Sequence, residues 1–402
     1  MRVGFFGNTN NYPFILANAF CQLGHDVEFV VDQKDPLYRP DSRNTISPRV
    51  GNLRIHDLSP ARFRHHLVPS GNVRHAIRIL QSCDAVLLNQ YGPSLGPRIG
   101  RPSIALLTGS DLYVFANPAA LDSLVVGNGR AIGRLTLALR RILFAVLIGR
   151  QRAGISRSVA VSYAPSGFDP EGDRLLAQLG VSEDRRISLL IADTNSVVQA
   201  PLPMNDVPQV LCIARLNWKK PYREGMKGMD YKGTDVMLKG IALYVSRTAR
   251  PLSVHMVRKG RDIAETEQLI RQLNLEGLVT WHDEMPQAKL LERIRAADLV
   301  LEQFGESFPS VGALEALAAG RPVIANWRFD QIPQYKAVSD QLCNATNADE
   351  LAVQLESLLS NRDLRRHFAF VGRAIVDEYF SAQAAAKSCL AFLEHCVSGR
   401  DK

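Results

Sequence analysis

The sequence predicts an α/β protein made of two Rossmann-like domains. Its 402 residues exceed what a single hydrophobic core usually organises, so two domains are expected. The chain opens with a strand at 2–7, an apolar helix at 14–23 and a second strand at 27–31, and this βαβ order is typical of a Rossmann-like half. The proline-bearing segment 200–208 then interrupts the pattern. We therefore assign residues 1–203 to the first domain.

The remaining elements continue the alternation of strands and helices. Further strands are expected at 52–58, 85–89, 103–108, 158–163, 186–191, 209–216, 252–257, 279–282, 299–304 and 322–327. Further helices are expected at 73–81, 130–152, 169–179, 310–318, 350–360, 363–379 and 382–397. The second domain accordingly spans 204–381.

Composition narrows the classes of protein that the chain can represent. Apolar residues make up 46% and charged residues 22%, which are ordinary values for a globular protein. The net charge of +8 favours an anionic partner such as a nucleotide, a nucleic acid or an anionic lipid. The sequence contains no recognisable nucleic-acid-binding motif and no basic–aromatic interleaving, so nucleic acid is not an expected partner.

Neither a cofactor nor a metal is expected. The six cysteines are scattered, without the spacing of a metal site, and are interpreted as reduced structural thiols. No D-x-D occurs in a site-like context, and the first βα turn lacks the G-x-G-x-x-G of nicotinamide and flavin proteins. No apolar run is long enough to span a bilayer, and polar residues 8–11 interrupt the N-terminus before a signal peptide could form. We therefore expect a cytoplasmic protein.

The stretch 299–327 carries the strongest signal for a functional site. It predicts a strand, an irregular loop, a helix from Ser310 to near Gly320, and another strand. The helix start directs unpaired N–H groups and a positive dipole end out of the sheet's carboxyl edge, which makes an anion site. Glu315 lies about one turn further on and would repel a phosphate, so its expected partner is a neutral diol such as a ribose. The alternative is a plain βαβ unit in which Glu315 is solvated.

At these residues the chain resembles the retaining GT-B glycosyltransferases of family 4. Residues 315–324, EALAAGRPVI, match the family's E-A-x-A-x-G-x-P-V-I context. The family carries a second glutamate upstream, and here Ser307 stands at that position. Glu306 is one residue earlier and would serve if the loop shifted by one residue. Otherwise the contact to the donor sugar is altered.

A second part of the resemblance lies at the start of the second domain. A strand ends at Arg215, and Lys232-Gly233-Thr234-Asp235 opens a helix, as in the family's G-R-L and K-G-x-D pattern. The family's Arg and Lys bind the donor diphosphate, which suits a guanidinium fork and a point charge acting without metal. The intervening loop is longer than usual, so Lys219 or Lys220 is an alternative to Lys232.

The resemblance implies a GT-B architecture with two facing Rossmann-like domains and a C-terminal helix that crosses back, so that 382–402 joins the first domain. The implied catalytic residues are Arg215, Lys232 and Glu306. The implied donor-binding residues are Gly7, Arg215, Lys232, His282, Ser307, Phe308, Pro309, Ser310, Val311, Gly312 and Glu315. Trp281 and Asp283 are further candidates for contact with the base.

On the acceptor side the candidates are Thr108 and Asp111. Thr108 stands where the family often has a histidine before a glycine. Asp111 either contacts the acceptor or caps the helix that follows, and the cap is the favoured interpretation.

The implied reaction is transfer of a sugar from a nucleoside diphosphate sugar to an acceptor hydroxyl with retention, in bacterial glycan or glycolipid assembly. The acceptor is expected to be a carbohydrate or a lipid-linked molecule. Two alternatives share the fold: a nucleotide-sugar 2-epimerase, and a catalytically weak nucleotide-sugar-binding protein, which the departures at Thr108 and Ser307 would explain.

The helix predicted at 130–152 suggests a membrane partner. The segment from Ser123 to Phe168 contains no Asp or Glu but several arginines. Arg130, Arg134 and Arg141 fall on one helical side with Arg152. A basic amphipathic helix of this kind is typical of contact with anionic membranes, which would place the protein on the inner face of the plasma membrane. The alternative is a core helix with a solvated arginine face.

Overall fold

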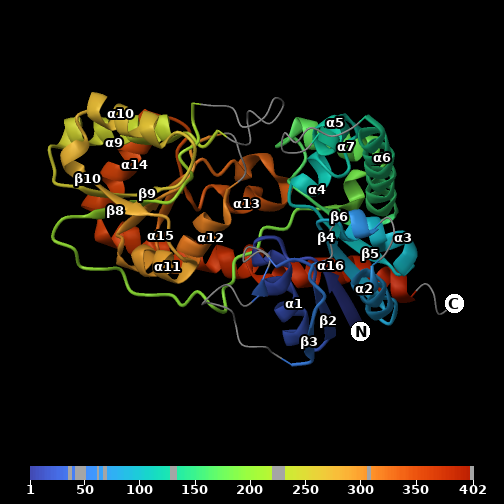
Figure 1. Cartoon of the computed structure of the whole chain (residues 1–402). Coiled ribbons are helices and arrows are strands. Elements are labelled where there is room, and N and C mark those ends of the chain that lie inside the picture. Colours follow the sequence, from blue (N-terminus) through green and yellow to red (C-terminus); the bar gives the residue numbers. More distant parts are fainter. Residues whose placement is uncertain are drawn as a thin grey trace. The chain divides into compact units, whose positions relative to one another are not determined.

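The computed structural model describes residues 1–34, 39–40, 51–60, 63–66, 70–126, 134–219, 231–305 and 309–398. Two compact units divide the chain: unit 1 comprises Met1–Leu189 and Ala382–Lys402, and unit 2 comprises Leu190–Ser381 (Figure 1). Each unit has one sheet, with strand order β3-β2-β1-β4-β5-β6-β7 in unit 1 and β10-β9-β8-β11-β12-β13 in unit 2. All the strand pairs are parallel, so the predicted fold class of two Rossmann-like domains is confirmed.

Unit 1 alternates strands and helices. Its strands are β1 Arg2–Phe6, β2 Asp26–Val31, β3 Leu53–Asp57, β4 Ala85–Asn89, β5 Ser103–Leu106, β6 Ala160–Ser162 and β7 Arg186–Ile187. Its helices are α1 Tyr12–Gln22, α2 Gly71–Gln81, α3 Gly96–Ile99, α4 Ser110–Tyr113, α5 Leu121–Val126, α6 Arg134–Arg157, α7 Pro170–Gln178 and α16 Ala382–Ser398.

An aromatic cluster fixes α1 on the sheet of unit 1. Phe5 of β1 contacts Phe20 of α1 edge-on, with ring centroids 5.6 Å apart, and stacks on Phe29 of β2 at 5.9 Å. Phe14 meets Phe29 at 5.4 Å. Helix α16 packs against α1 in turn, which is why α1 is apolar nearly all round and buried from Pro13 to Cys21.

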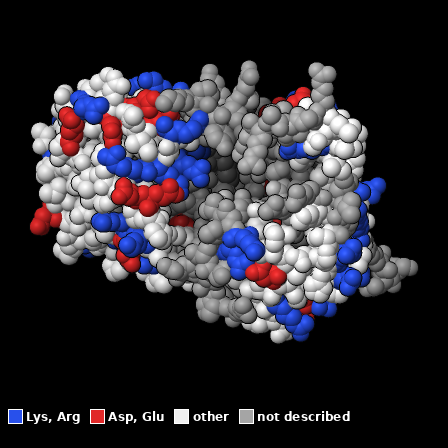
Figure 2. All heavy atoms as spheres, viewed as in Figure 1, with Lys and Arg blue, Asp and Glu red and all other residues white. Residues whose placement is uncertain are grey.

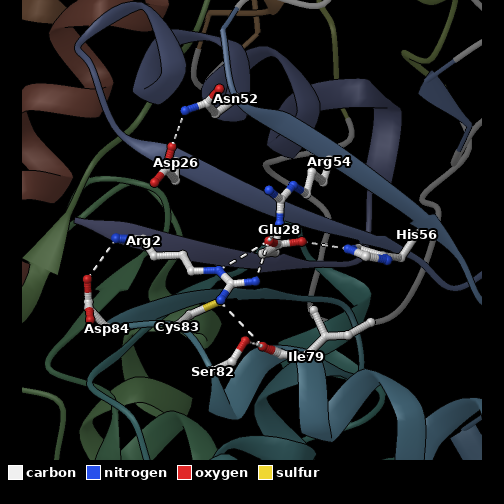
Figure 3. Close-up of polar contacts among 10 residues, drawn as sticks. All are labelled: Arg2, Asp26, Glu28, Asn52, Arg54, His56, Ile79, Ser82, Cys83 and Asp84. Carbon is white, nitrogen blue, oxygen red and sulfur yellow. Dashed lines mark hydrogen bonds and ion pairs between the residues drawn. The ribbon is translucent and has the colours of Figure 1, made fainter.

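A buried carboxylate joins the first three strands (Figure 3). Glu28 of β2 accepts from Arg2 Nη2 at 2.5 Å and lies 2.6 Å from His56 Nε2 and 3.4 Å from Arg54 Nη1. Burial raises the pKa of the Glu28 carboxyl, but the bonds from His56 and Arg2 outweigh it and the pKa is lowered. The cluster therefore stabilises the pairing of β1, β2 and β3 as long as Glu28 is ionised.

Unit 2 repeats the alternation around a second sheet. Its strands are β8 Gln209–Cys212, β9 Ser253–Arg258, β10 Val279–Asp283, β11 Leu299–Leu301, β12 Val323–Ala325 and β13 Cys343–Asn344. Its helices are α9 Thr234–Thr248, α10 Ile263–Gln272, α11 Gln287–Ala296, α12 Val311–Ala318, α13 Lys336–Ser339, α14 Ala348–Ser360 and α15 Arg362–Ile375. Leu238 and Ile241 of α9 pack with Leu351 and Leu355 of α14 in one buried cluster against the sheet.

The boundary between the domains differs from the prediction. The segment 190–201 belongs to unit 2, whereas we expected the first domain to extend to residue 203. Ala192 N–H donates to Phe380 O at 2.8 Å, and Ala200 N–H donates to Ala319 O at 3.1 Å. The buried guanidinium of Arg321 donates to the carbonyl oxygens of Ala200 and Pro201. These bonds are long-range in sequence, so the proline-rich composition alone could not reveal them. Helix α16 belongs to unit 1.

Several strands are shorter than predicted because their carboxyl ends leave the ladder. The strand expected at 299–304 ends at Leu301, after which Phe304 N–H donates to Lys232 O at 2.9 Å instead of to a neighbouring strand. The strand expected at 186–191 ends at Ile187. The arginine-rich helix expected at 130–152 is α6, which extends to Arg157, and residues 127–133 lie outside the described part. Among the described residues, no helix is long and apolar enough to cross a membrane.

Candidate functional site

The candidate site of unit 2 lies at the carboxyl edge of its sheet, where the strand order reverses. From β8 the chain moves outward to β9 and β10, then returns to place β11 on the other side of β8. Ligands of open α/β sheets bind outside such a switch point. The loops after β8 and β11 carry most of the residues that the sequence singled out for the donor.

Lys232 is held by the backbone of the loop after β11. Its N–H donates to Asn217 O at 2.7 Å and its carbonyl accepts from Phe304 N–H at 2.9 Å. Gly233 follows with φ +67°, and a Cβ there would stand 2.5 Å from the carbonyl carbon of Phe304. A Cβ on Gly305 would stand 2.0 Å from Tyr231 O. Both positions thus require glycine for the two loops to approach each other.

The Lys232 ammonium lies among polar groups of the same edge. Its Nζ donates to Gln303 Oε1 at 3.3 Å. Burial lowers the pKa of Lys232, and the nearby Arg215 charge lowers it further, while Glu302 raises it. Arg215 is exposed and Glu302 is buried. Two cations that repel each other at one sheet edge would both be stabilised by an anionic ligand.

Of the two alternative lysines, Lys219 lies in the described part of the chain and Lys220 does not. Lys219 is exposed, and its backbone N–H donates to Asp262 Oδ2 at 2.8 Å. The Arg215 charge lies near enough to Lys232 to lower its pKa. That Lys232, and not Lys219 or Lys220, contacts the diphosphate stays a prediction.

The start of α12 has the predicted cap. Ser310 Oγ accepts from Ala313 N–H at 3.3 Å, which leaves Val311 and Gly312 in the first turn. A Cβ on Gly312 would meet Ile213 Cδ1 of the loop after β8 at 3.1 Å, so the helix start lies beside that loop. Pro309 is buried just before the cap. The candidates Glu306, Ser307 and Phe308 lie outside the described residues.

Glu315 is buried rather than solvated, so the plain βαβ alternative is wrong on this point. Its side chain is 4% exposed and accepts a hydrogen bond from Gln287 Nε2, at the first residue of α11. A buried carboxylate is retained at a cost unless polar partners satisfy it. Gln287 was not anticipated, because nothing in its local sequence distinguishes it from an ordinary polar helix residue.

His282 lies on the edge strand β10 and belongs to a polar chain. His255 Nδ1 and His282 Nε2 are 2.9 Å apart, the two rings stack, and Ser253 Oγ lies 3.2 Å from His255 Nε2. Burial lowers the pKa of His282, and Arg293 lowers it further. The adjacent Trp281 lies under Arg258, whose guanidinium carbon is 4.7 Å from the ring centroid, and Asp283 is exposed. The imidazole of His282 and the indole of Trp281 can both contact an uncharged heterocycle such as a nucleotide base.

In unit 1 the acceptor-side candidates form a local turn. The Asp111 carboxylate accepts from the N–H groups of Thr108, Gly109 and Leu112 at 2.8–3.1 Å and from Thr108 Oγ1 at 3.1 Å. Burial is the main cause that raises the pKa of Asp111 to about 6, against the effect of these bonds. Asp111 is the second residue of α4, whose N-cap is Gly109, so the cap interpretation is wrong. Its carboxylate instead accepts from the N–H groups of the turn that precedes the helix. Gly7 turns the chain after β1 with φ +82°, and a Cβ there would stand 3.0 Å from Asn89 O.

Sequence reasoning missed the polar residues that follow β11 and β12. Gln303 is fully buried, and its backbone carbonyl accepts from Asn326 N–H at 2.9 Å. Asn326 Nδ2 also donates to Gly305 O at 3.1 Å, which ties the two loops together. A Glu-Gln pair directly after an apolar strand was the available signal. Among the described residues, no group of three or more His, Cys, Asp or Glu side chains is placed to hold a metal ion.

Comparison with known proteins finds a family model and a curated relative that match part of the chain. Residues 228–374 match the family model described as glycosyl transferases group 1. A curated relative, the MMP alpha-(1->4)-mannosyltransferase of Mycolicibacterium hassiacum, is 29% identical over 174 residues. That match covers 41% of this chain and 42% of the relative, so less than half of either protein is compared.

Solved structures resemble the whole chain. Sucrose-phosphate synthase from Thermosynechococcus elongatus superposes with a TM-score of 0.57 at 14% identity, covering 99% of this chain and 100% of that one. The Anabaena protein HepE, solved in complex with UDP and glucose, gives a TM-score of 0.58 at 14% identity, covering 98% and 100%. At these identities the likeness shows the fold alone, and the fold is GT-B.

Proposed function

We propose that this protein transfers a sugar from a nucleoside diphosphate sugar to the hydroxyl of an acceptor, with retention at the anomeric carbon. The observation that carries the proposal is the pair of cations, Arg215 and Lys232, beside the capped start of α12 at the switch point of unit 2. The match to the family of retaining enzymes at 315–324 supports the stereochemistry.

The proposed chemistry follows from where charge develops. The bond between the anomeric carbon and the diphosphate oxygen breaks, and negative charge accumulates on the departing diphosphate. A bond from the anomeric carbon to the acceptor oxygen forms, and the hydroxyl proton passes to the departing diphosphate. Arg215 and Lys232 stabilise that charge by ion pairing, and the N–H groups of the first turn of α12 add hydrogen bonds. Because two fixed cations meet the diphosphate, we propose that transfer needs neither a metal ion nor a cofactor.

The donor and acceptor are proposed by class. Buried Glu315 would accept hydrogen bonds from the ribose, and His282 with its partner His255 would contact the base. HepE was solved with UDP and glucose, so uridine diphosphate sugars are the first donors to test. We propose a carbohydrate or lipid-linked acceptor, in bacterial glycan or glycolipid assembly, reached from the cytoplasmic face of the membrane. The acid-free segment 123–168 supports that location.

The decisive experiment compares diphosphate with monophosphate binding. Calorimetry of uridine diphosphate and uridine monophosphate is run on the wild type, Arg215→Gln and Lys232→Gln, with Lys219→Gln as the matched control. The first two variants should lose about 1–3 kcal/mol more for the diphosphate than for the monophosphate, the scale of a hydrogen bond to a charged group.

Three outcomes would count against parts of this proposal. Equal losses for both ligands would contradict diphosphate contacts, and a dominant effect of Lys219→Gln would shift the role to the loop. Donor binding without turnover on any acceptor would favour a nucleotide-sugar-binding protein. Formation of an epimerised nucleotide sugar would favour a 2-epimerase.

A further inference from the structure

Helix α6 exposes a stripe of large apolar side chains. Leu135, Leu139, Ile142, Leu143 and Val146 are 77%, 55%, 63%, 43% and 41% exposed. Among the described residues, six of the eleven exposed large apolar side chains lie on this one helix. In Figure 2 the surface at the upper right, where Figure 1 places α6, is mostly white, with few charged atoms. Such a concentration on one surface differs from the scattered exposure usual in soluble proteins.

The stripe lies on the N-terminal half of α6, and the C-terminal half anchors the helix. The members of the stripe recur three and four residues apart and therefore share one side of the helix. The C-terminal half is packed: Gln151 is fully buried and bonds Ser94 N–H at 3.0 Å and Gln90 O at 2.6 Å. A Cβ on Gly154 would stand 1.7 Å from Pro93 O, so the helix lies directly against the chain beneath it. The helix cannot rotate to bury the stripe without breaking these contacts of Gln151 and Gly154.

The charges that α6 itself carries are all positive. Residues 123–168 contain no Asp or Glu, while α6 carries Arg140, Arg141, Arg150, Arg152 and Arg157 among its described side chains. Some of these arginines have protein partners. Arg152 Nη1 donates to Ala116 O at 3.0 Å, and Arg141 forms an exposed ion pair with Asp122 at 2.9 Å. An apolar face bordered by cations complements a surface with anionic groups over a hydrocarbon interior.

We infer that α6 is a membrane-docking surface: its apolar stripe enters the headgroup region of an anionic bilayer and its arginines pair with lipid phosphates. The inference rests on the peripheral membrane location proposed above and names the surface responsible. The apolar residues, and not only the arginines, supply the binding. Attachment should therefore weaken with salt but persist in part, because screening acts on the ion pairs and leaves the apolar contacts.

Vesicle co-sedimentation of the full-length protein tests this surface. Vesicles of pure phosphatidylcholine are compared with equimolar phosphatidylcholine and phosphatidylglycerol, at low and high salt. The triple variant Leu139→Gln, Ile142→Gln, Val146→Gln should bind the anionic vesicles at least about tenfold more weakly than the wild type. The matched control is Val353→Gln, Phe370→Gln, which changes exposed apolar residues of α14 and α15 and should bind as the wild type does.

Other outcomes of this experiment would overturn the inference or indicate a different partner for the stripe. Wild-type protein that stays in the supernatant with anionic vesicles overturns the inference, as does a triple variant that still sediments fully. A wild-type dimer by light scattering that the triple variant converts to monomer would show instead that a second copy covers the stripe. Uridine diphosphate affinity is measured in parallel: its retention in the triple variant shows a folded protein, and its absence in the wild type would count against the proposed donor and not against docking.

Discussion

At the residue scale, the buried carboxylate of Glu315 is the proposed contact to the ribose of the donor. It is 4% exposed and bonded by Gln287. If it also accepts a hydrogen bond from a ribose, Glu315→Ala should weaken uridine diphosphate binding by about 1–3 kcal/mol, the scale for losing a charged hydrogen-bond partner. Calorimetry measures this.

A ligand series provides the control for Glu315. Removing the 2′-hydroxyl from the nucleotide should cost affinity in the wild type but much less in Glu315→Ala, because the acceptor for that hydroxyl is already gone. The same loss in both proteins would place the ribose elsewhere.

A second carboxyl, Asp32 at the end of β2, should make stability depend on pH. It is 1% exposed, and burial raises its pKa from 3.8 to about 7. Between these values the folded state binds more protons than the unfolded chain, so the contribution of Asp32 to stability falls as pH rises from about 4 to about 7. Asp32→Asn should remove that loss, so that its gain over the wild type is larger at pH 8 than at pH 4.5 by about 2–4 kcal/mol.

Urea denaturation at the two pH values checks the Asp32 prediction. Asp184→Asn is the matched control, because that side chain is exposed and the substitution removes the same charge. If the increase in the free energy of unfolding does not depend on pH, or is shared with the control, the ionised Asp32 carboxylate costs the folded state no stability.

At the scale of elements, the donor site depends on two loops whose backbones touch. A Cβ on Gly305 would stand 2.0 Å from Tyr231 O, so Gly305→Ala must push the loop after β11 away from Lys232. We expect diphosphate affinity to fall by about 1–3 kcal/mol while monophosphate affinity changes less, since the displaced group is the ammonium. The measurement is the same calorimetric pair.

The matched substitution for the loop prediction is Gly277→Ala, where an added Cβ meets nothing within 4 Å. It should leave both affinities unchanged. A folded Gly305→Ala protein with normal diphosphate affinity would show that Lys232 does not depend on this contact for its position.

The same elements show what local sequence can and cannot reveal. The strand at 85–89 was predicted with its exact bounds, because an unbroken run of apolar residues indicates a buried strand. The pairing of Gln303 with Lys232, and of Gln287 with Glu315, joins residues far apart in the chain and leaves no local pattern. The cap at Ser310 was predictable because its partner is three residues away.

At the scale of the whole molecule, the segment 190–201 should unfold with unit 2. Its N–H groups at Ala192 and Ala200 bond Phe380 O and Ala319 O. In the full-length chain, Leu238→Ala in the core of unit 2 should accelerate hydrogen exchange of this segment, and Leu16→Ala in the core of unit 1 should not. Substitutions of this kind cost about 2–5 kcal/mol, enough to change exchange strongly. Faster exchange of this segment in Leu16→Ala but not in Leu238→Ala would support the predicted domain boundary at residue 203.

The assignment of α16 to unit 1 has a consequence for how the chain is made. Ala386, Cys389 and Leu393 are buried on α16, which packs against α1 near the opposite end of the sequence. A ribosome releases α1 long before α16, and all of unit 2 emerges in between. The apolar face of α1 that α16 covers therefore stays exposed until translation is almost complete. Unit 2 can complete its own core before unit 1 does, although it is encoded second.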